Sequence, residues 1–121
     1  MEAYFLDTYA LIEILKENEN YERFKNTVNF TSLLNLFELH YIITRTNNEK
    51  KADVILEELK NLAVPFDLID IKLASALKMK FKIKRLSYID CLGYAISINK
   101  KIKFLTGDKE FENLNNVEFV K

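Results

Sequence analysis

Ala3-Tyr4-Phe5-Leu6 is a short apolar run, and Asp7-Thr8 and a helical pattern over residues 9–16 follow it at once. Such a run predicts a buried strand, and a polar residue directly before a helix-period segment is typical of a helix start. Short apolar runs and longer helical segments continue to alternate along the chain. Crossover helices that link parallel strands produce this alternation, so we predict an α/β domain with a mainly parallel sheet.

The remaining elements are predicted from the same two periodicities. Further strands are expected at residues 28–31, 64–68, 102–105 and 117–120, and further helices at residues 33–46, 51–62, 71–80 and 88–99. Pro65 cannot donate a backbone hydrogen bond, which places the strand at 64–68 at a sheet edge or puts Pro65 at its start. Gly107-Asp108 is expected to form a turn.

The composition is that of a globular protein. The chain has 121 residues, of which 49% are apolar and 30% charged, with two glycines and one proline. This length suits one domain of ordinary size, so we expect residues 1–121 to form a single domain. One cysteine and one histidine give no basis for a disulfide framework or a Cys/His zinc site, and a reducing, cytoplasmic setting is expected.

No membrane role is expected. Acidic residues interrupt the apolar N-terminal stretch, which also lacks the basic flank of a signal peptide. The most apolar later run, residues 33–43, contains Glu38 and His40. It also falls short of the roughly 20 residues that a membrane span needs.

The net charge is zero, but the charges are unevenly distributed along the chain. Residues 72–103 hold nine basic side chains and one acidic side chain, Asp90. Residues 1–71 hold seven basic and thirteen acidic side chains. The basic block has two interpretations that the sequence leaves open, a solvated surface or a track for a polyanion.

Two carboxylates follow predicted strands directly. Asp7 comes after the strand at 3–6, and Asp108 comes shortly after the strand at 102–105. Functional crevices in parallel sheets lie beyond the carboxyl ends of the strands, so these two side chains are expected at one edge. Each also has a purely structural interpretation, as a helix cap or turn residue.

Glu38 and Asp90 lie on predicted helices. Glu38 stands within a strongly apolar helix, where an ionised carboxylate must be paired, hydrated or bound to a cation; Arg45 or another basic residue is the structural alternative. Asp90 follows Ser87 at the spacing of a capping box, which is its structural interpretation. If all four acids met in one crevice, their mutual repulsion would imply a bound cation. Oxygen ligands of this kind suit Mg²⁺, with Mn²⁺ as a second possibility.

Four short segments together resemble the PIN-domain family, and within it the small VapC-type toxins of toxin–antitoxin pairs. The segments are Phe5-Leu6-Asp7-Thr8, Asn35-Leu36-Phe37-Glu38, Ser87-Tyr88-Ile89-Asp90-Cys91 and Leu105-Thr106-Gly107-Asp108-Lys109-Glu110-Phe111. Each is weak alone, but their order and spacing cover nearly the whole chain. The resemblance implies a three-layer α/β/α sandwich around the parallel sheet.

The resemblance also implies chemistry and partners. It gives Asp7, Glu38, Asp90 and Asp108 the roles of catalytic metal ligands and suggests that Thr8 and Thr106 orient carboxylates or waters. The implied activity is that of a Mg²⁺-dependent endoribonuclease that cleaves RNA phosphodiesters with a metal-activated water. Members of this family commonly form homodimers and are inhibited by a cognate antitoxin. For such a substrate, the candidates for phosphate contacts in the basic block are Lys80, Lys82, Lys84 and Arg85.

Alternatives to a toxin remain open at this point. The chain could be a PIN-fold nuclease of RNA processing that has no antitoxin, or a non-catalytic PIN module that binds RNA or protein. A neighbouring reading frame that encodes a DNA-binding antitoxin would distinguish a toxin from an RNA-processing nuclease. The presence of all four acids argues against a non-catalytic module. Tyr88 and Tyr94 could stack on bases, although aromatic residues at helical spacing more often belong to the core.

Overall fold

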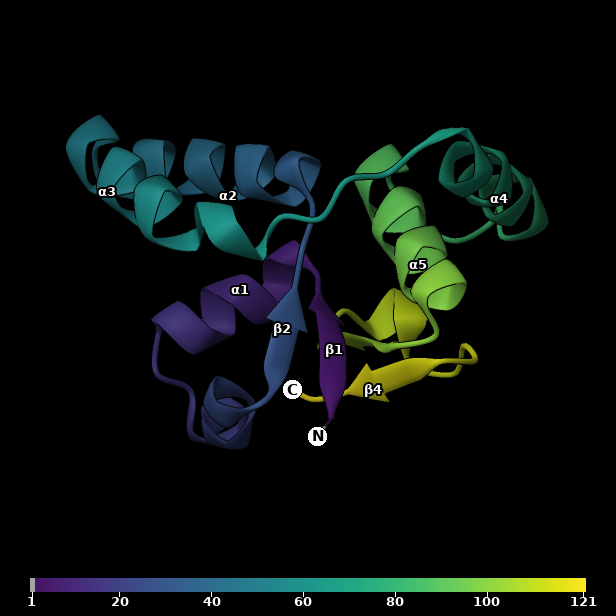
Figure 1. Ribbon diagram of the computed structural model, residues 1–121, viewed down its shortest axis with the longest axis horizontal. Coiled ribbons are helices and arrows are strands. Elements are labelled where there is room, and N and C mark those ends of the chain that lie inside the picture. The colour runs from purple at the N-terminus through teal and green to yellow at the C-terminus, as the bar shows by residue number, and fades with distance from the viewer. Residues whose placement is uncertain (1) are drawn as a thin grey trace.

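The computed structural model describes residues 2–121 and contains a four-stranded parallel sheet in the order β2-β1-β3-β4 (Figure 1). The strands are β1 (Ala3–Leu6), β2 (Val28–Phe30), β3 (Lys103–Thr106) and β4 (Val117–Phe119). The two central strands, β1 and β3, are the apolar runs that are most deeply buried. Strands buried on both faces read as continuous apolar runs, which is why the sequence marks them clearly.

The register of the sheet aligns the strand ends. Leu6 pairs with Leu105 and Thr106 pairs with Phe119, so the carboxyl ends of β1, β3 and β4 lie at one edge. Residues that directly follow β1 and β3 are therefore brought to the same edge of the sheet. This is the edge that carries the acidic residues described below.

Helices cover both faces of the sheet. They are α1 (Thr8–Leu15), α2 (Leu33–Thr46), α3 (Glu49–Leu59), α4 (Leu68–Lys80) and α5 (Tyr88–Lys100), with 3₁₀ segments η1 (Glu19–Asn26), η2 (Lys60–Leu62) and η3 (Lys109–Phe111). In Figure 1 the hairpin of α2 and α3 lies at the upper left, the pair α4 and α5 lies at the upper right, and β2 points toward them.

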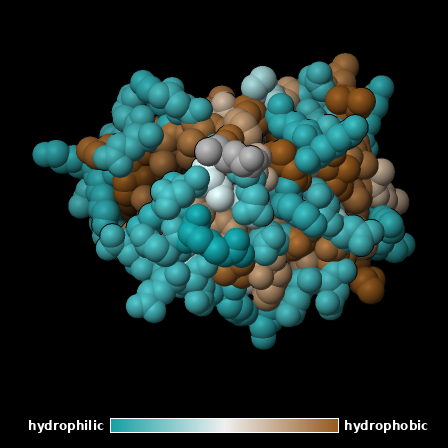
Figure 2. All heavy atoms as spheres, turned by 60° about the horizontal axis from the view of Figure 1, so that its bottom comes forward, coloured by the Kyte–Doolittle hydropathy of each residue, from teal (hydrophilic) through white to brown (hydrophobic). Residues whose placement is uncertain are grey.

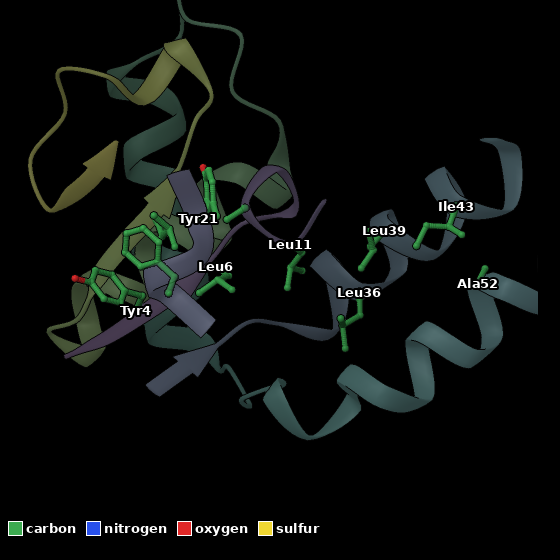
Figure 3. Close-up of a cluster of buried hydrophobic side chains, with 11 residues drawn as sticks. Tyr4, Leu6, Leu11, Tyr21, Leu36, Leu39, Ile43 and Ala52 are labelled. Carbon is green, nitrogen blue, oxygen red and sulfur yellow. The ribbon is translucent and has the colours of Figure 1, made fainter. Parts of the chain in front are cut away.

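Two hydrophobic clusters lie on opposite faces of the sheet, because successive side chains of a strand alternate in direction. Tyr4 and Leu6 join the cluster formed with α1, α2 and α3, several of whose side chains are drawn in Figure 3. Phe5 and Phe104 join the cluster formed with α4 and α5. The predicted three-layer α/β/α sandwich with a parallel sheet is confirmed.

The strand predicted at residues 64–68 is wrong. The contact made there is a single bridge between Ala63 and Thr31, after which the chain runs without regular structure to α4. Pro65 offers no N–H to a neighbouring strand. Asp67 then starts α4 at Leu68, earlier than expected, through a capping box with Asp70. The 3₁₀ segment η1 was not predicted at all.

The surface is mainly polar on the side that holds the chain ends. Figure 2 turns that side toward the viewer and shows hydrophilic side chains separated by smaller apolar patches. Within residues 2–121, no helix combines the length and the apolar character needed to cross a membrane.

Candidate active site

Asp7 lies at the carboxyl end of β1 and caps α1. Its Oδ1 accepts a hydrogen bond from the backbone N of Ala10 at 2.8 Å, and its Oδ2 accepts one from Thr106 Oγ1 at 2.5 Å. Only 3% of the residue is exposed. Burial raises the pKa of Asp7 to about 7; the two hydrogen bonds oppose this rise, and the charges of Asp90 and Asp108 add to it.

Asp108 reaches the same edge from β3. Its Oδ1 accepts from the backbone N of Glu110 at 3.0 Å, which caps η3, and its own backbone N donates to Thr106 Oγ1 at 3.0 Å. Thr106 therefore joins the Asp7 carboxylate to the backbone of Asp108. A Cβ atom at Gly107 would overlap the Tyr9 ring and the carbonyl oxygen of Val120. The close passage of the chain between β3 and Asp108 thus requires glycine.

Asp90 stands at the start of α5, where the predicted capping box is present. Its Oδ2 accepts from the backbone N of Ser87 at 2.9 Å, and its backbone N donates to Ser87 Oγ at 3.0 Å. Burial raises the pKa of Asp90, the bonds from Ser87 oppose the rise, and the charges of Asp108 and Glu38 add to it. Asp90 therefore caps α5 and also lies where the charges of Asp108 and Glu38 act on it.

Glu38 enters this group from α2. The side chain is half-buried, and within residues 2–121 it forms no hydrogen bond or ion pair. Arg45, considered as a partner from the sequence, instead lies over the Tyr41 ring at 5.3 Å. The charge of Glu38 acts on Asp90, so the apolar helix α2 delivers a carboxylate to the acids at the sheet edge.

Asp7, Glu38, Asp90 and Asp108, the acidic site, are thus linked by mutual repulsion. In the part of the chain that the structure describes, no three His, Cys, Asp or Glu side chains are close enough to hold a metal ion as they stand. The donor set still fits a hard divalent cation, because all four side chains offer carboxylate oxygens. Among residues 2–121, the buried Asp7 has two hydrogen-bond donors but no cationic partner, so the charge of its ionised form is only partly compensated. An ion would require the four side chains to draw closer.

A buried polar network beside Asp7 was missed by sequence reasoning. Ser32 Oγ donates to Asn35 Oδ1 at 2.6 Å, and Asn35 Nδ2 donates to Thr8 Oγ1 at 3.1 Å. In the described part of the chain, the Thr8 hydroxyl therefore forms a hydrogen bond with Asn35 and none with a carboxylate, whereas Thr106 donates to Asp7. Asn35 precedes Glu38 by about one helical turn within an apolar helix, and this spacing was the available signal for a role.

The four basic residues proposed for phosphate contacts lie at the end of α4 and in the loop that leads to α5, here called the basic loop. They are Lys80, Lys82, Lys84 and Arg85. Across residues 2–121, none of them lies within salt-bridge distance of a carboxylate. The backbone N of Arg85 donates to Glu110 Oε1 at 2.7 Å, which ties the basic loop to the segment that follows Asp108.

The other candidates separate clearly. Tyr94 is buried and packs in the core against Phe104 and Phe111. Tyr88 is 80% exposed and does not belong to the core. His40 Nε2 lies 2.7 Å from Asp53 Oδ1 at the surface between α2 and α3.

Comparison with known proteins agrees with this fold. The PIN domain family matches residues 4–117. Among solved structures, the chain is similar to VapC20 of Mycobacterium tuberculosis, a toxin that cleaves the sarcin-ricin loop, with a TM-score of 0.79, 18% identity and coverage of 98% of this chain and 99% of that chain.

Two further solved structures share the fold. VapBC2 of Rickettsia felis, bound to a fragment of its promoter DNA, gives a TM-score of 0.76 at 18% identity, with 98% of this chain and 99% of that chain covered. FitAcB of Neisseria gonorrhoeae gives 0.72 at 20% identity, with 96% of each chain covered. No curated protein sequence matches the chain. With a family match from residue 4 to residue 117 and a parallel sheet flanked by helices, the chain belongs to the PIN domain family.

Proposed function

We propose that this protein is a metal-dependent endoribonuclease and the toxin of a toxin–antitoxin pair. The observation that carries the proposal is the acidic site, in which the charges of Asp90 and Asp108 act on the buried Asp7, and those of Asp108 and Glu38 act on Asp90. Each of the aspartates caps a helix, but capping does not require Asp7, Asp90 and Asp108 to lie where their charges act on one another. A shared cation would offset this repulsion.

The four carboxylates would hold Mg²⁺ or Mn²⁺. Such an ion lowers the pKa of a bound water and offsets charge that develops on a phosphodiester under attack. The Thr106 hydroxyl fixes the direction of the Asp7 carboxylate. The raised pKa of Asp7 means that its proton must leave before a cation can bind. The charges of the basic loop, unpaired with carboxylates in residues 2–121, are suited to holding RNA phosphates.

An antitoxin partner, a homodimer and a cytoplasmic setting complete the proposal. The antitoxin is supported by the fold shared with toxin–antitoxin complexes. A homodimer is supported by large apolar side chains that stand in solvent, such as Ile83 at 94% and Met79 at 70% exposure. Light scattering at roughly tens of micromolar, a range set by typical protein affinities, should show a dimer, and a strict monomer there removes this part.

Cleavage of total RNA by the wild type and by Asp7→Asn tests the activity. The wild type should cleave in Mg²⁺ or Mn²⁺ and lose activity in excess EDTA, while Asp7→Asn keeps the side-chain size and loses the charge. Undiminished cleavage in EDTA overturns the mechanism. A neighbouring gene that encodes a DNA-binding protein able to suppress the activity would distinguish a toxin from an RNA-processing nuclease.

A further inference from the structure

Tyr88 exposes a large aromatic ring beside the acidic site. It is the first residue of α5, two positions before Asp90, and 80% of its surface faces solvent. Tyr94, one and a half helical turns later, is 3% exposed and belongs to the core. The exposure of Tyr88 is therefore not explained by packing within the chain.

The Tyr88 ring is held by a cation. The Lys78 ammonium lies 4.7 Å from the ring centroid, and the same Nζ donates to the carbonyl oxygen of Leu86 at 2.8 Å. The second contact anchors Lys78, so the ammonium orients the ring. The exposed remainder of the ring is free to receive a planar group.

Tyr88 also borders a mainly apolar groove between the start of α2 and the pair α4 and α5. The groove has a volume of about 490 Å³, and its lining includes Leu34, Ala74, Lys78, Tyr88, Cys91 and Leu92. This volume falls within the range of about 300–1,000 Å³ that is usual for small-molecule sites.

Two helices that line the groove, α2 and α5, also carry acids of the acidic site. Leu34 lies one helical turn before Glu38 on α2, and Cys91 directly follows Asp90 on α5. A molecule whose reacting bond reaches the acids therefore has its neighbouring atoms close to the groove. The basic loop, which runs directly into Tyr88, places positive charge at the same approach.

We propose that an unpaired base of an RNA substrate enters this groove and stacks on Tyr88, so that Tyr88 is a positioning residue for the adjacent phosphodiester. This inference rests on the proposed function. A nucleobase has apolar faces that suit the ring and the apolar lining, and it carries a phosphate that suits the neighbouring cations. A protein segment would match the apolar lining but would not require the cations.

Binding of single-stranded RNA in EDTA tests the proposal without cleavage. The probe is a short RNA with one 2-aminopurine, whose fluorescence falls when the base stacks. Tyr88→Phe keeps an aromatic face and should bind and quench like the wild type. Tyr88→Leu and Tyr88→Ala should weaken binding by roughly 5- to 150-fold, the usual effect of removing one stacked aromatic side chain, and should abolish quenching.

Two controls sharpen this comparison. Phe66→Ala removes an aromatic side chain from the linker before α4 and should leave both readouts unchanged. An RNA that is abasic at the probe position should bind the wild type and Tyr88→Ala equally. Because Tyr88 is exposed, its variants should keep their folding, which circular dichroism checks.

The outcomes separate this inference from the proposed function. If the wild type binds and cleaves RNA and Tyr88→Ala matches it, stacking on Tyr88 is overturned while the nuclease function stands. If Tyr88→Leu binds as well as the wild type, the site recognises apolar surface and not an aromatic face, and the proposal also fails. If Tyr88→Ala changes the oligomeric state and leaves RNA affinity unchanged, the face around Tyr88 contacts protein and not RNA, and the proposal is overturned. If the wild type neither binds nor cleaves RNA, both fail.

Discussion

Thr106 donates a 2.5 Å hydrogen bond from its hydroxyl to Oδ2 of Asp7, and the two residues stand at the ends of the neighbouring strands β3 and β1. The same hydroxyl accepts from the backbone of Asp108. One buried side chain thus couples two of the four acids, and it is one of the two groups whose hydrogen bonds hold down the pKa of Asp7.

Thr106→Val should raise the pKa of Asp7 further. Valine keeps the shape of threonine and removes the donor that lowers the pKa of Asp7, which burial has already raised to about 7. The acid limb of the activity profile should therefore move to higher pH, as measured by single-turnover cleavage across a pH series. Thr46→Val, at the exposed end of α2, should leave the limb in place. If the acid limb of the pH–activity profile stays in place in Thr106→Val, the hydrogen bond from Thr106 does not lower the pKa of Asp7 as proposed.

The stability of the metal-free protein should fall as the pH rises. The pKa of Asp7 is raised in the folded chain from 3.8 to about 7, so folding favours its protonated form. The stabilisation of the folded protein by protonated Asp7 is complete below the pKa of the unfolded chain. It is lost as the pH rises through the pKa of Asp7 in the folded chain. The loss is on the order of 4 kcal/mol, and urea unfolding in EDTA at several pH values measures it.

Asp7→Asn supplies the matched variant for this pH dependence. It cannot ionise, so its stability should vary less between about pH 4 and pH 7, the interval between the unfolded and folded pKa values of Asp7, and at the upper end it should exceed that of the wild type. Identical slopes for the two proteins would show that Asp7 ionises in the folded chain as easily as in the unfolded chain.

Asn35→Ala should destabilise the protein. The buried amide joins Ser32 to Thr8, and its removal takes the acceptor from Ser32 Oγ and the donor from Thr8 Oγ1. The expected loss is about 1–3 kcal/mol in the free energy of unfolding, measured by urea denaturation. Asn61→Ala, at an exposed position in η2, should change it by less than about 0.5 kcal/mol. If Asn35→Ala and Asn61→Ala lower the free energy of unfolding equally, the hydrogen bonds of Asn35 do not stabilise the fold as proposed.

Neutralising Lys80, Lys82 and Lys84 to Gln should weaken binding to unrelated RNAs. Each lysine that contacts a phosphate displaces counterions from the RNA. The slope of log affinity against log salt concentration should therefore become shallower by up to about 2 for single strands. RNA affinity at several salt concentrations measures this, in EDTA to prevent cleavage.

A second triple variant controls for net charge. Lys50, Lys51 and Lys60 are exposed on α3 and η2, and their change to Gln alters the total charge equally. This variant should keep the salt dependence of the wild type. If both triple variants behave alike, the basic loop is only a solvated surface and the RNA track lies elsewhere.

Much of the fold was predictable because the deciding signals are local. The buried run of β1 and the helix that follows Ser32 were placed with accurate bounds, since continuous burial and a side-chain cap both leave marks within a few residues. The segment at 64–68 failed because an apolar pair around Pro65 resembles a strand, whereas strand formation depends on a partner edge that Pro65 cannot serve.

The candidate site was predictable in part for the same reason. Asp7 and Asp108 follow parallel strands, and a general rule places such residues at one edge. The proximity of Glu38 to Asp90 depends on how α2 and α5 pack, and the bond from Thr106 to Asp7 depends on β1 and β3 being neighbours. These are tertiary relationships that no local pattern contains.

The position of β1 in the sheet sets the order in which the acidic site can assemble on a growing chain. β1 is synthesised early, but the strand that fills its second edge is β3, and the hydrogen bond between Asp7 and Thr106 spans 99 positions. Until residues 103–108 are available, Asp7 lacks both Thr106 and Asp108, and the edge of β1 stays open. A partly synthesised chain without β3 therefore carries no assembled site, and on the proposed function RNA near the site of synthesis is spared until β3 and Asp108 have been made.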